Sequence, residues 1–154
     1  MFIQICHEIS KNYPEVKVDD FIVDAMMAHV VRRPEFFDTI VTTNMFGDIL
    51  SDLTAGLVGG LGLIAGANIG KDCAIFEAVH GTAPDIAGKG IANPISLLLA
   101  SGLMLDHVGH PELATRLRTA IELTLNQDNV KTTDLGGKAT TTTFTEALVK
   151  RLKS

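Results

Sequence analysis

The stretch Gly47-Asp48-Ile49-Leu50-Ser51-Asp52 decides how this chain is interpreted. It follows Asn44 and has the pattern of the first turns of a helix, so Asp48 and Asp52 share one helical face. Two like charges at this spacing destabilise a helix by roughly a few tenths of a kcal/mol. A bound divalent cation would offset the repulsion, and carboxylate oxygens suit Mg²⁺ or Mn²⁺. The stretch therefore predicts a metal site, although paired acids on a helix often only face solvent.

A second stretch, His80-Gly81-Thr82-Ala83-Pro84-Asp85-Ile86-Ala87-Gly88-Lys89, is typical of a short loop whose backbone amides can hold a nucleotide. Asp85 is suited to accept hydrogen bonds from both hydroxyls of a ribose, and its charge would repel a 2′-phosphate. The glycines between Gly56 and Gly66 follow a helix and have the wrong spacing for a dinucleotide fingerprint. The residues alone thus permit a nucleotide site without requiring one.

Composition limits the classes of function. The 154 residues suffice for one ordinary domain with a core. The 46% hydrophobic content indicates either a well-filled core or apolar surface that packs against a further segment or subunit. A net charge of −5 without a basic stripe argues against nucleic acid as a partner. The apolar window 49–69 is interrupted by Asp52 and several glycines, so we expect no membrane span.

The start of the chain has no signal-peptide pattern. Cys6 and Cys73 lie far apart in apolar settings, which predicts reduced, buried thiols rather than a disulfide. We therefore expect a cytoplasmic protein, or one of the mitochondrial matrix if the source is eukaryotic.

Strands alternate with helices along the predicted elements, which favours the α/β class. Helices are expected at 2–11, 21–32, from 44 onward, 93–107, 111–126 and 144–153. Strands are expected at 16–18, 39–43 and 73–79. The glycine-rich passage from Gly56 to Gly70 is expected to be a loop between two structural parts, and 80–90 and 132–143 are expected to be loops.

Five runs carry a resemblance to the C-terminal half of the β-decarboxylating dehydrogenases, the family of isocitrate, isopropylmalate and homoisocitrate dehydrogenases. They are residues 21–26, 44–53, 80–89, 92–94 and 134–137. The resemblance covers essentially the whole chain and implies an incomplete α/β fold like that of isocitrate and isopropylmalate dehydrogenases. It implies that residues 1–62 are part of the small, dimerising domain with the metal aspartates, and that 63–154 are part of the large NAD-binding domain.

The resemblance also implies ligands for metal and cofactor. Asp48 and Asp52 would bind Mg²⁺ or Mn²⁺ in one subunit, and Asp24 would reach the same ion from the neighbouring subunit of a homodimer or larger oligomer. NADP-using relatives have a basic residue and a tyrosine in place of Asp85 and Ile86, so this pair favours NAD. The residues implied to bind NAD are Asn44 and Glu77 near the nicotinamide, His80, Gly81, Asn93 and Asp134 around the adenine, and Asp85 with Ile86 at the ribose. Thr82 and Ala83 of the same loop are also implied to contact the cofactor.

Within the family, the glycine pattern of 59–62 and 66–70 is most similar to NAD-dependent isocitrate dehydrogenase of the tricarboxylic acid cycle, which oxidatively decarboxylates isocitrate to 2-oxoglutarate. Isopropylmalate and homoisocitrate dehydrogenases are alternatives, because the residues that select the 2-hydroxy diacid lie upstream. The catalytic lysine and tyrosine of the family are also expected upstream. Lys11 and Lys17 lie too close to Asp24, and Tyr13 lies in a Tyr-Pro turn. The chain alone is therefore expected to be inactive, or to be a non-catalytic regulatory or dimerisation module.

Overall fold

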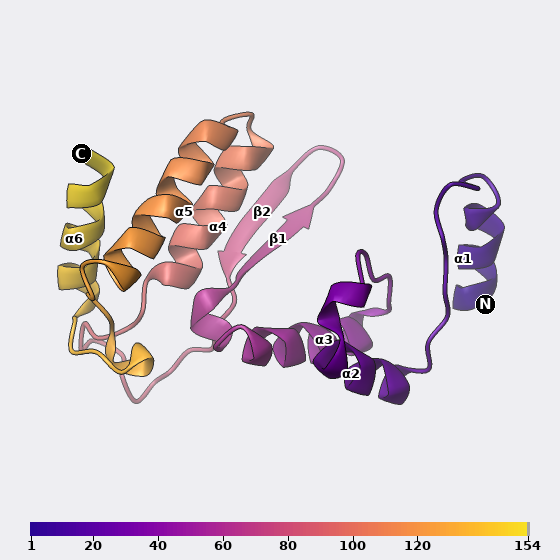
Figure 1. The fold of residues 1–154 in the computed structure, drawn as a ribbon, viewed down its shortest axis with the longest axis horizontal. Coiled ribbons are helices and arrows are strands. Elements are labelled where there is room, and N and C mark those ends of the chain that lie inside the picture. The colour runs from indigo at the N-terminus through magenta and orange to yellow at the C-terminus, as the bar shows by residue number, and fades with distance from the viewer. Residues whose placement is uncertain (154) are drawn as a thin grey trace. The chain divides into compact units, whose positions relative to one another are not determined.

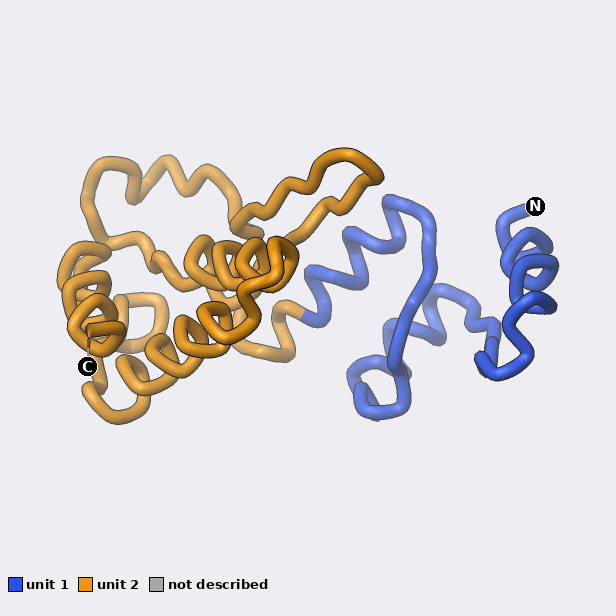
Figure 2. The backbone as a smooth tube through the Cα atoms, turned by 90° about the horizontal axis from the view of Figure 1, so that it is seen from above, with its two compact units in different colours: residues 1–54 blue, residues 55–154 orange. Residues whose placement is uncertain are grey.

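The computed structural model describes residues 1–153. The chain divides into two compact units, Met1–Thr54 and Ala55–Ser154 (Figure 2). The division falls inside helix α3 (Asn44–Leu57), before the expected boundary at 62/63. The roles expected for the two parts stay predictions.

The first unit contains helices α1 (Phe2–Ser10) and α2 (Val23–Arg32), the short 3₁₀ helix η1 (Pro34–Phe36) and most of α3 (Figure 1). Its buried core consists of Met26, Val30 and Leu50. Met26 and Val30 are four residues apart, so they form one apolar face of α2 toward α3.

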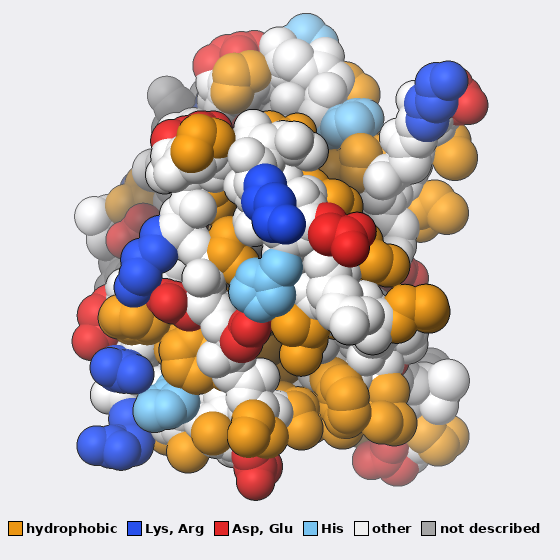
Figure 3. Space-filling model, turned by 90° about the vertical axis from the view of Figure 1, so that its right-hand side faces the viewer, with side chains coloured by type: hydrophobic (Ala, Val, Ile, Leu, Met, Phe, Trp, Pro, Cys, Tyr) orange, Lys and Arg blue, Asp and Glu red, His pale blue; other side chains and the backbone are white. Residues whose placement is uncertain are grey.

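Helix α1 has no buried residue. Its apolar side chains Phe2, Ile3, Ile5 and Ile9 are all exposed. Hydrophobic side chains are also abundant on the molecular face in Figure 3. The first unit therefore presents apolar side chains at its surface, and the further segment or subunit expected to cover such surface stays a prediction.

The expected strands at 16–18 and 39–43 are wrong, because neither segment is a strand in the structure. β-Branched residues favour extended backbone, but a strand also needs a neighbouring strand to accept and donate its backbone hydrogen bonds. The only sheet within residues 1–153 is in the second unit, so these two segments have no partner strand.

The second unit contains a hairpin of strands β1 (Ala65–Ile69) and β2 (Ala74–Ala78), which pair antiparallel with Gly66 opposite Glu77. Helix α4 (Ile95–His107) packs against both strands and against α5 (Pro111–Asn126), and α6 (Thr141–Lys153) packs on α5 (Figure 1). Two short 3₁₀ helices, η2 (Leu61–Leu63) and η3 (Thr133–Leu135), complete the unit. The core lies among the helices and consists of Ile95, Ala120, Ile121, Phe144 and Leu148.

The predicted helices at 93–107 and 111–126 and the strand at 73–79 are confirmed within two residues. Strand β1 was missed, because residues 65–69 lie in the expected glycine-rich loop. Helix α6 begins three residues before the expected start. Thr140 and Thr143 exchange hydrogen bonds there: the hydroxyl of each accepts from the backbone N–H of the other, at 3.1 and 2.8 Å.

The two cysteines are not both buried, so that expectation is wrong. Cys73 is exposed and Cys6 is half-buried. Cys73 lies in the hairpin turn, where its carbonyl accepts from the Gly70 N–H, and Cys6 lies on α1, which has no fully buried residue. Within the described part of the chain, no helix has both the length and the apolar character needed to cross a bilayer.

Candidate functional site

The two carboxylates of the predicted metal site lie on α3, as the spacing requires. Asp48 and Asp52 are both exposed, and the helix places them one turn apart on one face. The Asn44 amide donates to Asp48 Oδ2 at 2.8 Å. Within residues 1–153, no hydrogen bond or ion pair engages the Asp52 side chain. One carboxylate is therefore oriented by a neighbour, and the other is open to solvent or to a ligand.

Asp24 lies in the first turn of α2, and its side chain is exposed. Its Oδ1 accepts from the Ala25 backbone N–H at 2.6 Å. Negative charge at this end of a helix is favoured by the helix dipole. Among residues 1–153, no three His, Cys, Asp or Glu side chains lie close enough together to hold an ion. A single copy thus presents the α3 pair without Asp24.

Asn93 and Asp134, two residues expected at the adenine, meet directly. Asn93 Nδ2 donates to Asp134 Oδ2 at 2.9 Å, although the residues are 41 positions apart. Asn93 Oδ1 also accepts from the Ile95 N–H at 3.0 Å, so the same side chain binds the first backbone amide of α4. A Cβ built on Gly62 would lie 3.6 Å from both polar atoms of the pair. Three segments therefore converge here: η2, the start of α4 and η3.

The expected nucleotide loop leaves β2 at His80 and reaches α4 without regular structure. Ala83 adopts a positive φ of 39°, and its carbonyl accepts from the Ile86 N–H at 3.0 Å, which forms a local turn. His80 Nδ1 contacts the Gly81 carbonyl at 2.9 Å. Asp85 is exposed, and among residues 1–153 its carboxylate has no protein partner. The ribose-binding role predicted for Asp85 is compatible with this exposure.

The two residues expected near the nicotinamide belong to different units, so each is described within its own unit. Glu77 lies on β2, where its Oε1 accepts from the Asn68 amide of β1 at 2.9 Å. Asn44 belongs to the first unit, where its amide is bonded to Asp48. Glu77 and Asn44 are therefore each oriented by a partner within their own unit.

Two hydroxyl residues that hold the ends of the loop were missed by the sequence analysis. Ser96 Oγ donates to the Ile64 carbonyl at 2.6 Å and accepts from the Val79 N–H at 2.9 Å. Thr141 donates two hydrogen bonds to the other end of the loop. Its backbone N–H donates to the Gly90 carbonyl at 2.8 Å, and its Oγ1 donates to the Ala92 carbonyl at 2.5 Å. Serine and threonine at helix starts are common caps, so nothing in the sequence marked them.

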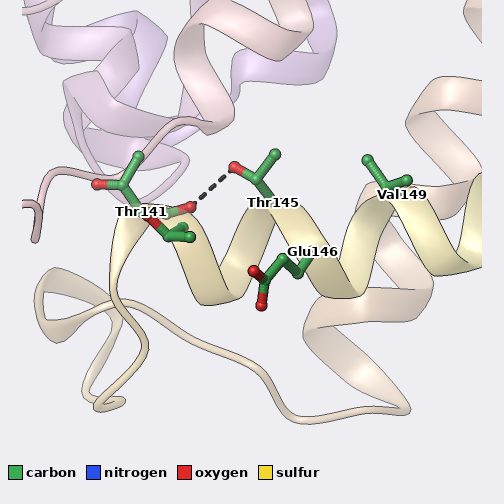
Figure 4. A pocket seen from close by; sticks show the side chains of 5 residues that line it. Thr141, Thr145, Glu146 and Val149 are labelled. Carbon is green, nitrogen blue, oxygen red and sulfur yellow. Dashed lines mark hydrogen bonds between the residues drawn. The ribbon is translucent and has the colours of Figure 1, made fainter.

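A shallow depression lies elsewhere in the second unit, along one face of α6 (Figure 4). Its lining residues are Thr141, Thr142, Thr145, Glu146 and Val149, and Thr145 Oγ1 donates to the Thr141 carbonyl at 2.8 Å within it. One carboxylate and a largely apolar lining offer neither a cluster of metal ligands nor donors for a phosphate. None of the predicted site residues lines this depression.

Comparisons with known proteins agree with the sequence pattern. The family model described as isocitrate/isopropylmalate dehydrogenase matches residues 1–148. The chain is 55% identical over 154 residues to an isocitrate/homoisocitrate dehydrogenase of Thermus thermophilus, covering all of this chain and 46% of that protein. It is 50% identical to a 3-isopropylmalate dehydrogenase of Archaeoglobus fulgidus, covering 99% of this chain and 46% of that protein.

A solved structure is also similar. The crystal structure of isocitrate dehydrogenase from Methylococcus capsulatus superposes with a TM-score of 0.93 at 51% identity, over 99% of this chain and 46% of that chain. The present chain thus spans less than half the length of the relatives it matches. The expectation of an incomplete α/β fold of this type is confirmed.

Proposed function

Because this chain belongs to the isocitrate/isopropylmalate dehydrogenase family, we propose that it is the C-terminal part of an NAD-dependent isocitrate dehydrogenase, which oxidatively decarboxylates isocitrate to 2-oxoglutarate. The observation that carries the proposal is the open carboxylate pair of Asp48 and Asp52 on α3. The Asn93–Asp134 contact beside the loop from β2 supports a nucleotide site in the second unit.

The α3 pair fits a hard divalent cation. Carboxylate oxygens are the preferred ligands of Mg²⁺ and Mn²⁺, and the exposure of both side chains leaves room for water and for substrate oxygens. Asp48 and Asp52 would hold the ion, with Asn44 orienting Asp48. When bound, such an ion supplies Lewis-acid stabilisation of negative charge on a substrate oxygen. We further propose a homodimer or larger oligomer in which Asp24 of a neighbouring copy completes the ligand set.

The second unit would hold NAD, which accepts a hydride when bound. Asp85 would accept hydrogen bonds from the adenosine ribose hydroxyls, because its carboxylate is exposed and has no protein partner among residues 1–153. His80, Gly81 and the bonded pair of Asn93 and Asp134 would contact the adenine. The same carboxylate at Asp85 would repel a 2′-phosphate, which is the basis for proposing NAD rather than NADP.

A neighbouring substrate is the second candidate. The 50% identity to an isopropylmalate dehydrogenase is close to the 55% identity to an isocitrate/homoisocitrate dehydrogenase, so isopropylmalate and homoisocitrate remain alternative 2-hydroxy diacids. All three substrates place a hydroxyl and a carboxylate where one metal ion can bind both. A metal ion held by Asp48 and Asp52 on α3 would therefore suit any of the three substrates.

Nucleotide binding is the direct test of the second unit. We expect calorimetry of the purified chain to show NAD binding that is stronger than NADP binding, and Asp85→Ala to weaken NAD binding at least tenfold. Asp72→Ala is the matched control, because Asp72 is also an exposed aspartate of the second unit but lies in the hairpin turn. Equal affinity of Asp85→Ala and the unmodified chain for NAD would refute the ribose assignment.

Metal binding tests the first unit. Titration with Mn²⁺, followed by electron paramagnetic resonance, is expected to show a site that Asp52→Asn weakens about tenfold, whereas Asp38→Asn, an exposed control in the same unit, leaves it unchanged. The chain with isocitrate, Mg²⁺ and NAD is expected to produce no NADH, because no residue of the chain matches the family's catalytic lysine or tyrosine. NADH formation at an ordinary enzymatic rate would contradict that assignment.

A further inference from the structure

Ser96 is a fully buried polar residue that joins three elements of the second unit. Its side chain lies in the first turn of α4 and has no exposed surface. The hydroxyl donates to the Ile64 carbonyl, immediately before β1, and accepts from the Val79 N–H, immediately after β2. Both of these backbone groups lie outside the β1–β2 register, so the hairpin itself does not pair them. One hydroxyl therefore satisfies a donor and an acceptor where the chain leaves the sheet.

The position of Val79 sets where the predicted nucleotide loop begins, because His80 is the next residue. The Val79 side chain also lies against Gly66 of β1, because a Cβ on Gly66 would lie 3.3 Å from Val79 Cγ2. The far end of the loop has its own anchors, since Thr141 binds the carbonyls of Gly90 and Ala92. Between these points the loop has only local turns, so its geometry depends on where its ends are held.

We propose that Ser96 is a positioning residue for the nucleotide loop. It acts through Val79: the hydrogen bond holds the last backbone amide before His80 against α4 and thereby fixes the direction in which residues 80–86 leave the sheet. Removing the hydroxyl leaves the Val79 N–H and the Ile64 carbonyl without a partner in an interior position, and the strand end is released. The proposal rests on the proposed NAD site for its functional consequence, but the positioning itself is a property of the unliganded chain.

The test compares two buried hydroxyls. Thr124 is the matched control, because it is also fully buried and its Oγ1 donates to the Ala120 carbonyl within α5. Amide hydrogen exchange is measured by mass spectrometry for the unmodified chain, Ser96→Ala and Thr124→Ala. We expect exchange of peptides from residues 79–92 to be about tenfold faster in Ser96→Ala and unchanged in Thr124→Ala. Equal exchange of this segment in Ser96→Ala and the unmodified chain would overturn the proposal.

A second measurement needs no variant and covers the case in which Ser96→Ala does not fold. In the unmodified chain, nuclear magnetic resonance is expected to show the Val79 amide exchanging much more slowly than the amides of Gly81 and Thr82, because only Val79 is bonded to a buried side chain. A Val79 amide that exchanges as fast as its successors in the loop would refute the hydrogen bond on which the proposal depends.

Calorimetry with NAD separates this proposal from the proposed function. If the unmodified chain binds NAD, Ser96→Ala is expected to bind it about tenfold more weakly and Thr124→Ala to bind it normally, even where both lower the unfolding midpoint. Faster loop exchange with unchanged NAD affinity overturns the nucleotide role of Ser96. No NAD binding by the unmodified chain refutes the proposed NAD site, while the exchange experiment still decides whether Ser96 positions the loop.

Discussion

The Asn93–Asp134 contact allows an exchange of partners that tests its energetic role. Asn93→Ala removes two interactions: the hydrogen bond from the Ile95 N–H and the hydrogen bond to Asp134. Loss of the hydrogen bond from the Ile95 N–H costs about 1 kcal/mol. The amide–carboxylate bond contributes about 1 kcal/mol more, at the low end for a charged acceptor because Asp134 is exposed. We therefore expect Asn93→Ala to lower the free energy of unfolding by about 2 kcal/mol.

Asn93→Asp separates the two effects, because a carboxylate oxygen still accepts from the Ile95 N–H while the donor to Asp134 is lost. This variant is expected to lose about 1–2 kcal/mol, since two carboxylates then face each other. Combining it with Asp134→Asn restores one amide and one carboxylate with their places exchanged. Urea unfolding followed by circular dichroism is expected to show the double variant within about 0.5 kcal/mol of the unmodified chain. Losses that simply add in the double variant would refute the direct contact.

Three further outcomes are expected. Phe144→Ala should lower the free energy of unfolding of the second unit by about 3–5 kcal/mol in urea titrations, because the ring is fully buried in the core; an effect below about 1 kcal/mol would contradict this core. Gly137→Ala should abolish the cooperative thermal transition of that unit, because its Cβ would lie 1.9 Å from the Lys131 carbonyl oxygen; normal melting would show that this close approach is wrong. The hydrogen bond from Arg151 lowers the pKa of Asp128 from its ordinary value of 3.8, so the stabilisation is present above about pH 3.8 and is lost as the pH falls through the lower folded-state pKa. Asp128→Asn should remove that part of the acid dependence in urea unfolding measured from pH 5 downward, and an unchanged profile would exclude the contribution.

The helices that carry strong local signals were predicted well. Both ends of helix α5 were predicted correctly, because Pro111 is suited to a first helical position and the apolar spacing continues to Asn126. Strand β1 was not predicted, because alanine and glycine have little intrinsic preference for strands. It forms because β2 offers a complete set of backbone partners from Ala74 to Ala78.

The site was predictable only where it is local in sequence. The spacing of Asp48 and Asp52 predicted that both carboxylates share one helical face, and the helix expected there is α3. The meeting of Asn93 with Asp134 depends on how η3 returns to the start of α4, which no local pattern encodes. The role of Ser96 was not predicted for a related reason. Its hydroxyl binds backbone groups of Ile64 and Val79, so no pattern of side chains indicates these contacts.

The anchored ends of the proposed nucleotide loop have a consequence for how a cofactor preference there can evolve. Closing a loop whose ends are already fixed costs only about 0.6 kcal/mol for each doubling of its length. Residues between Val79 and Gly90 can therefore be exchanged, or a residue inserted near Gly88, with little penalty to the fold, because the groups that hold the ends lie outside the segment. They are the Ser96 hydroxyl and the Thr141 N–H and hydroxyl. The scaffold that holds the loop is chemically independent of the side chains that we propose to distinguish one nucleotide from another. Selection can thus alter the pair Asp85 and Ile86 while the framework that presents them stays constant.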